Sequence, residues 1–213
     1  MWNIFDIDHI FIVLKGYKLS YAEFLGTLFG LLSVWFAAKQ HMLTWYTGII
    51  NILFFVALFY QVQLYSDMFL QFYYLGMTIY GWYTWRNEMR EDQPIHVLSH
   101  KQRIMSSVSI ITLSAAMGLL MKNIHWMLPS LFTEPAAYPW LDSAIAVMSI
   151  FAMTMMAKRQ LESWILWILV NILCIYVYTM KHILFTAWEY AIFLCLAFVG
   201  LRNWYRLSLE KEK

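Results

Sequence analysis

The side chain that stands out first in this sequence is a single carboxylate within an apolar, aromatic run. Glu189 lies in FTAWEYAIF, in the last of the long apolar segments. If that segment spans a bilayer, Glu189 sits about 9 Å below the outer surface, at 1.5 Å per residue. A carboxylate at that depth must face a cavity or a partner, or stay protonated through desolvation. It therefore either contacts a ligand or makes a structural hydrogen bond to another helix.

A second group with chemical potential combines two indoles and an amide. Trp164, Trp167 and Asn171 are spaced 0, 3 and 7 in WILWILVN, which places them on one face of a helix. Two indoles can stack a flat heteroaromatic ring, a positive charge on that ring strengthens the contact, and the amide can orient its edge. An aromatic stripe at this spacing is ordinarily packing, and only the asparagine favours a binding site.

Further polar groups come from an earlier part of the chain. Asn51 supplies an equivalent amide, Gln71 and Tyr74 lie in the next apolar segment, and Tyr190 follows the carboxylate directly. The two asparagines are about 10–12 Å from one membrane surface, and Gln71 and the carboxylate approach from the other. In a hydrocarbon core of roughly 30 Å these depths nearly meet. The sequence therefore predicts one binding site near the midplane.

Other kinds of chemistry find little support in the sequence. No apolar segment carries a chain of Asp, Glu and His for a proton relay, or paired acids for sodium. His96 and His100 are four residues apart but have no evident third ligand. There is no GxxxxGK[ST] loop, and the segments hold no nucleophile–base pair. Cys174 and Cys195 lie in apolar runs, as packed thiols do. We therefore expect no enzyme, no metal and no cofactor.

The elements that position these residues are transmembrane helices. The chain has 213 residues, of which 62% are apolar and only 13% charged, with a mean hydropathy of +0.56. Soluble domains carry about 25% charged residues. The net charge of +2 makes nucleic acid an unsuitable partner. In lipid, backbone amides must be satisfied within their own segment, so the spans are helices. We expect seven of them: 21–38, 43–62, 66–85, 104–121, 141–157, 164–180 and 183–201.

The distribution of basic residues predicts the orientation of these spans. Eleven of the 15 Lys and Arg residues fall on one side, with clusters in 86–103 and 202–213. The positive-inside rule makes that side cytoplasmic, so the C-terminus is predicted to be cytoplasmic and the N-terminus external. Residues 2–14 are apolar but short and carry three ionisable side chains, so we expect an interfacial helix there.

Two parts of the chain resemble each other. Residues 21–86 and 140–205 match at a displacement of 119 or 120 positions. Glu189 has no acidic counterpart in the first copy, where Leu70 or Phe69 stands. The predicted site is therefore asymmetric, as a ligand with one positive ring requires. The matched pairs are Glu23 with Asp142, Lys39 with Lys158, Asn51 with Asn171, Gly81 with Gly200 and Trp85 with Trp204.

Two three-helix copies separated by one helix give an all-α, 3+1+3 membrane architecture. An odd linker leaves both repeats facing the same way, and in transporters of this kind the site lies where the repeats meet. The expected division is an external segment 1–19, a first repeat 20–86, a loop–linker–loop region 87–139, a second repeat 140–205 and a cytoplasmic tail 206–213.

Four stretches of the chain resemble the PnuC family of vitamin transporters. These are LYSDMFLQFYYLGMTIYGWYTW (64–85), YPWLDSAIAVMSIFAMTMMAKR (138–159), ESWILWILVNILCIYVYTM (162–180) and WEYAIFLCLAFVGLRNW (188–204). The similarity covers residues 20–206. It implies a fold similar to that of SWEET sugar transporters, a homotrimer in the membrane lipid, and location in the bacterial inner membrane. Carried over, the family's stacking tryptophan and amide fall on Trp167 and Asn171, and its acid falls on Glu189.

The resemblance also implies a small cationic heteroaromatic substrate. Members of the family import nicotinamide riboside or, in the PnuT branch, thiamine, by facilitated diffusion with trapping by a separate cytosolic kinase. The stretch QVQLYSDMFLQFYYLGMTIYGWYTW looks nearer the thiamine branch, so we expect thiamine, with nicotinamide riboside as the alternative. A SWEET-like sugar transporter is the rival class, against which a lone acid argues, because a neutral ligand would leave its charge uncompensated.

Overall fold

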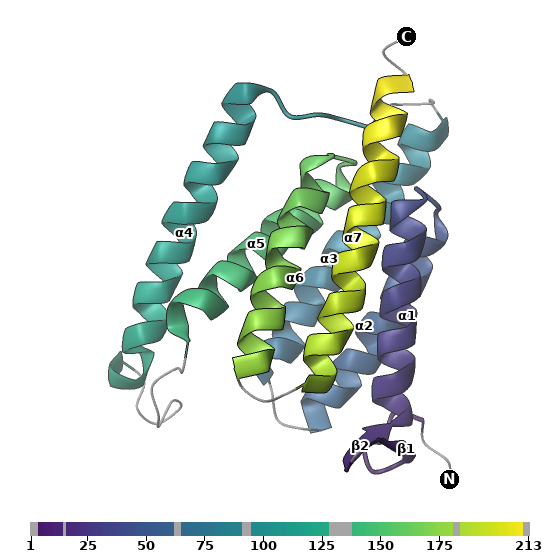
Figure 1. Ribbon diagram of the computed structural model, residues 1–213, viewed down its shortest axis with the longest axis vertical. Coiled ribbons are helices and arrows are strands. Elements are labelled where there is room, and N and C mark those ends of the chain that lie inside the picture. Colours follow the sequence, from purple (N-terminus) through teal and green to yellow (C-terminus); the bar gives the residue numbers. More distant parts are fainter. Residues whose placement is uncertain are drawn as a thin grey trace. The chain divides into compact units, whose positions relative to one another are not determined.

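The computed structural model describes residues 4–14, 16–61, 65–90, 95–127, 138–180 and 184–210. It divides into two compact units, Met1–Gln93 and Pro94–Lys213. The first unit begins with a hairpin and continues with three helices that pack in chain order (Figure 1). Its elements are β1 (Ile10–Leu14), β2 (Tyr17–Ser20), α1 (Tyr21–Ala38), α2 (Leu43–Gln61) and α3 (Tyr65–Arg90).

The second unit consists of four helices, each packed against the next along the chain. They are α4 (His100–Met127), α5 (Pro139–Ala157), α6 (Glu162–Met180) and α7 (Leu184–Glu210). Within the described residues the order of helices is therefore three, one and three, as the sequence predicts. The predicted boundaries agree closely for α1, α2, α5 and α6, whereas α3, α4 and α7 extend beyond the apolar stretches.

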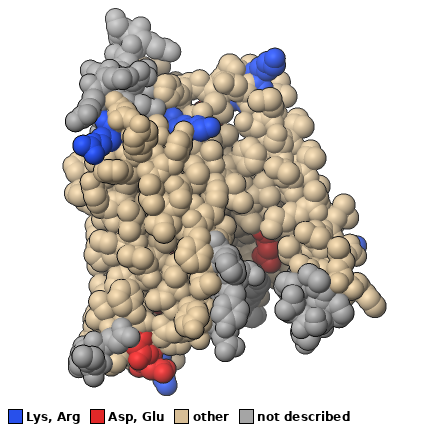
Figure 2. Space-filling model, turned by 180° about the vertical axis from the view of Figure 1, so that it is seen from behind, with Lys and Arg blue, Asp and Glu red and all other residues tan. Residues whose placement is uncertain are grey.

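Six of the described helices are long and apolar enough to cross a membrane: α1, α2, α4, α5, α6 and α7. Large apolar side chains on α4 are exposed, among them Ile111 at 69% and Val108 at 57%. Such a surface suits lipid rather than water. Figure 2 shows a face of the molecule on which charged side chains are few. The chain is a multi-pass membrane protein. α3 is long enough at 26 residues but more polar, and its assignment as a span stays a prediction.

The N-terminal segment differs from the prediction. Within residues 4–14 the structure has turns followed by β1, which pairs antiparallel with β2, and no interfacial helix. The run Ile-Phe-Ile-Val-Leu is β-branched and aromatic, which favours a strand. Gly16 has φ of +89°, a conformation that a helix does not accept. Ser20 then caps α1 by accepting a hydrogen bond from the Glu23 amide at 3.1 Å. Residues 2 and 3 of the predicted helix lie outside the described residues.

The predicted repeat is confirmed in the turns that follow α1 and α5. Gln40 and Arg159, 119 positions apart, have φ of 53° and 52°. Their neighbours repeat the same hydrogen bonds. The amide of His41 donates to the Phe36 carbonyl at 2.9 Å, and the amide of Gln160 donates to the Met155 carbonyl at 2.9 Å. Two sequences with little identity here therefore build one turn.

The repeat also holds in the packing of the helices that follow each turn. Trp45 of α2 lies over Gly81 of α3 and meets Trp85 edge-to-face, with ring centroids 5.0 Å apart. In the second unit Trp164 of α6 lies over Gly200 of α7 and meets Trp204 at 5.7 Å. None of the four tryptophans is more than 3% exposed. We call each set a tryptophan–glycine lock.

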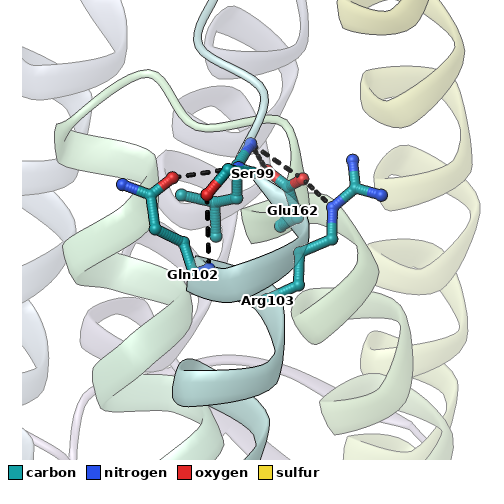
Figure 3. A network of polar contacts seen from close by, with 5 residues as sticks. Ser99, Gln102, Arg103 and Glu162 are labelled. Atoms are coloured by element: carbon teal, nitrogen blue, oxygen red, sulfur yellow. Dashed lines mark hydrogen bonds and ion pairs between the residues drawn. The ribbon is translucent and has the colours of Figure 1, made fainter.

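A carboxylate at the start of α6 connects the linker helix to the second repeat. The first repeat has no such carboxylate, because Leu43 stands at the position that corresponds to Glu162. The Glu162 carboxylate, at the start of α6, accepts a bifurcated hydrogen bond from the Leu98 amide, at 3.1 and 3.2 Å, and a further hydrogen bond from Arg103 Nε at 2.9 Å (Figure 3). Ser99 and Gln102 form a reciprocal cap on α4, at 2.9 and 3.3 Å. We call the Glu162–Leu98–Arg103 contacts the linker clamp.

Candidate functional site

One face of α6 brings together most of the chemistry predicted for the second repeat. Trp167, Asn171 and Tyr178 have spacing 0, 4 and 11 and share that face, since four and seven residues are close to whole helical turns. Trp167 and Tyr178, with Tyr190 of α7, pack against a buried cluster of Met148, Val170 and Cys174. The face is therefore aromatic on both sides of one amide.

Asn171 is the polar group at the centre of this face. It is only 5% exposed. Among the buried polar side chains that the structure describes, it is the one carboxamide. A buried amide needs a hydrogen-bond partner, because leaving it unpaired costs about 1–3 kcal/mol. An amide at this position, flanked by aromatic rings, can bind the polar edge of a flat ligand.

The two candidates in α7, Glu189 and Tyr190, are consecutive in the sequence. The Tyr190 ring stacks on Tyr178 with centroids 5.4 Å apart and planes 11° from parallel. Glu189 is partly buried and already interacts with another group of the protein. Both interpretations offered by the sequence, a ligand contact and a structural contact, therefore remain for this carboxylate.

Trp164 precedes Asn171 by seven residues and so shares its face of α6, but it is packed against α7. It is 1% exposed and its ring fills the space over Gly200. It occupies the position that Trp45 has in the first unit, 119 residues earlier. Its burial favours packing, the alternative that spacing alone left open.

The first unit contributes three candidates. Asn51 Nδ2 donates to the Gly26 carbonyl at 2.8 Å and so ties α2 to α1. Gln71 and Tyr74 are partly buried on α3, and Tyr74 lies 5.7 Å from Tyr73 between ring centroids. Gln71 stands at the α3 position that Tyr190 has in α7, 119 residues later. The convergence of these residues with the α6–α7 group stays a prediction.

Tyr178 was not among the predicted residues, although its spacing of seven from Asn171 continues the same helix face. A pocket of about 220 Å³ also lies between α6 and α7, and none of the predicted residues lines it. Its walls are apolar apart from Thr179. Of the described residues, no three His, Cys, Asp or Glu side chains are grouped as metal ligands.

Comparisons with known proteins identify the family and several relatives. The family model described as "Nicotinamide mononucleotide transporter" matches residues 20–206. The nicotinamide riboside transporter PnuC of Escherichia coli (strain K12) is 29% identical over 223 residues, which cover 95% of this chain and 92% of that protein. The riboflavin/roseoflavin transporter RibM of Streptomyces davaonensis is 24% identical, covering 94% and 92%.

A solved structure supports the same assignment. The crystal structure of the vitamin B3 transporter PnuC matches with a TM-score of 0.68 and 26% identity, over 89% of this chain and 82% of that one. These relatives are named as transporters and none as an enzyme. None is named for thiamine, so the expectation of a thiamine transporter receives no support.

Proposed function

The chain belongs to the nicotinamide mononucleotide transporter family, and on that premise we propose that it carries nicotinamide riboside across the bacterial inner membrane. This was the alternative to thiamine in the sequence analysis. Similarity to a nicotinamide riboside transporter over 95% of the chain supports it. The structural observation that carries the proposal is the buried amide of Asn171 between the aromatic side chains of α6.

The chemistry of nicotinamide riboside matches this face. Its nicotinamide ring is flat, carries a positive charge through its bond to ribose, and bears a carboxamide on its edge. Trp167 can stack on the ring, and its indole face attracts the charge. The Asn171 amide has both a donor and an acceptor, so it can pair with the ligand's carboxamide. Glu189 supplies a compensating negative charge.

The transport step proposed is facilitated diffusion. A carrier moves substrate uphill only if a second ligand or energy source biases its states differently. The sequence has no nucleotide-binding loop and no proton relay or sodium site within its apolar segments. Net uptake then depends on consumption of the substrate inside the cell, which phosphorylation by a cytosolic kinase would provide.

Calorimetry of the purified protein tests the substrate. Nicotinamide riboside, nicotinamide mononucleotide, riboflavin and thiamine are titrated in turn, and a neutral sugar serves as the control. We expect the tightest binding with nicotinamide riboside. Riboflavin as the tightest ligand would place the chain functionally with RibM, and thiamine or sugar as the tightest would overturn the proposal.

A further inference from the structure

Two tyrosine rings lie face to face between α6 and α7. Tyr178 and Tyr190 have centroids 5.4 Å apart and planes 11° from parallel. Both rings are partly rather than fully buried, and both pack on the Met148–Val170–Cys174 cluster. This arrangement differs from the tryptophan–glycine locks, whose rings meet edge-to-face and are at most 3% exposed.

The position of the stack relates it to the proposed binding face. Tyr178 follows Asn171 by seven residues on the same face of α6, which places it about 10 Å further along the helix. It lies two residues before Met180, where α6 ends, on the side that the charge distribution predicts to be external. Tyr190 comes from α7, directly after Glu189. The stack therefore crosses from α6 to α7 between Asn171 and that helix end.

The stack is a property of one repeat and not of the shared scaffold. The residues 119 positions before Tyr178 and Tyr190 are Phe59 and Gln71, so the first repeat has no aromatic pair there. The tryptophan–glycine lock and the turn geometry, in contrast, occur in both. A feature needed only to hold three helices together would be expected in both repeats as well.

We propose that Tyr178 is a further substrate-contacting residue and that the Tyr178–Tyr190 stack closes the outer side of the binding face over Asn171. This inference rests on the proposed function. Separating two stacked rings loses one aromatic contact, and a flat, positively charged ligand ring replaces it with a contact strengthened by its charge. A ligand without such a ring, for example a sugar, does not offset that loss. The pair thus selects for the nicotinamide part of the substrate.

Binding measurements on matched variants test the role of Tyr178. Tyr178→Leu keeps the approximate bulk but removes the aromatic face, so its affinity for nicotinamide riboside should fall about tenfold, the scale of one lost ring-stacking contact. Tyr178→Phe keeps the ring and should bind more tightly than Tyr178→Leu. Tyr176→Leu is the control, because Tyr176 lies on the same helix but is 52% exposed, and its affinity should match the unmodified chain.

Chemical labelling provides a readout that a purely structural role would not move. Tyr178→Cys is made in a chain with Cys174→Ala and Cys195→Ala and treated with a small maleimide. Nicotinamide riboside should slow the labelling. Unchanged labelling, or equal affinities for Tyr178→Leu and the unmodified chain, would overturn the inference. If either of these results is found while the unmodified chain binds nicotinamide riboside and Trp167→Ala does not, only the role of Tyr178 is wrong. If the unmodified chain does not bind nicotinamide riboside, the proposed function itself is wrong.

Discussion

Glu189 is a carboxylate within a membrane span, where a charge needs a compensating group. Glu189→Gln removes the charge with little change in shape. We expect binding of nicotinamide riboside to weaken by about 1–3 kcal/mol, the usual scale of a charge-assisted hydrogen bond. Calorimetry measures the change, and Asp8→Asn is a control that removes an exposed acid before β1. A loss of folding without any change in affinity would assign Glu189 to structural packing.

Trp164 and Trp167 are one helical turn apart but have different environments. Trp167→Ala should cut the affinity for nicotinamide riboside with little effect on thermal stability, because the residue is partly buried at the edge of a cluster. Trp164→Ala should lower the free energy of unfolding by about 3–5 kcal/mol, the usual cost of removing a buried tryptophan side chain. Calorimetry and thermal unfolding in detergent separate the two effects. Equal losses of affinity and stability at both positions would mean that the whole stripe is packing.

At the scale of single elements, each tryptophan–glycine lock depends on a missing side chain. A methyl group at Gly81 or Gly200 would overlap the ring of Trp45 or Trp164. We expect Gly81→Ala and Gly200→Ala each to lower stability by about 1–3 kcal/mol through overpacking. Gly76→Ala is the matched control in α3, because nothing lies within 4 Å of the added carbon. That variant should be unchanged or stabilised by up to about 1 kcal/mol, since alanine favours helices. Thermal unfolding that ranks Gly76→Ala with the other two would contradict this account.

The linker clamp predicts unequal effects from its two charged partners. The Glu162 side chain is 11% exposed and the Arg103 side chain is 52% exposed. Arg103→Ala removes a largely solvated partner and should cost less than about 1 kcal/mol. Glu162→Ala also leaves the buried Leu98 amide unpaired and should therefore lower the free energy of unfolding by about 1–3 kcal/mol more. Hydrogen exchange at residues 95–103 measures the local effect, and equal protection in both variants would show that the carboxylate does not hold the amide.

At the scale of the whole molecule, the proposed transport is equilibrative. In proteoliposomes, uptake of nicotinamide riboside should stop when the internal and external concentrations match, and an imposed proton or sodium gradient at zero potential should not move that endpoint. A membrane potential should move it, because the substrate is charged and each charge gains about 2.3 kcal/mol per 100 mV. A nicotinamide riboside kinase with ATP inside the vesicles should make accumulation continue. Concentrative uptake driven by sodium or pH alone would reveal a coupling site. It would be sought first at Glu23, Asp67 and Asp142, the acids near the ends of the predicted spans.

The sequence by itself determined the helices and the repeat. Spans can be read from apolar length because lipid offers no partner for backbone amides, so each segment must be helical whatever its neighbours are. The pairs Gly81 with Gly200 and Trp85 with Trp204 could be matched because few residue types fit those positions in both copies. Asn171 could be singled out because an amide in an apolar run needs a partner.

Only the tertiary structure distinguished the aromatic residues that are fully buried from those that are partly exposed. Trp164 and Trp167 have equivalent spacing, but the first faces Gly200 on another helix, and no pattern within α6 reports that. Tyr178 became a candidate through its stack with Tyr190 of α7. The N-terminal segment is a hairpin because β1 pairs with β2 and the Phe11 ring stacks on Phe24, with ring centroids 4.3 Å apart. In each case the deciding contact joins two separate elements. The periodicity of one segment reports only which of its residues share a face, so it carries no information about the free energy of such a contact.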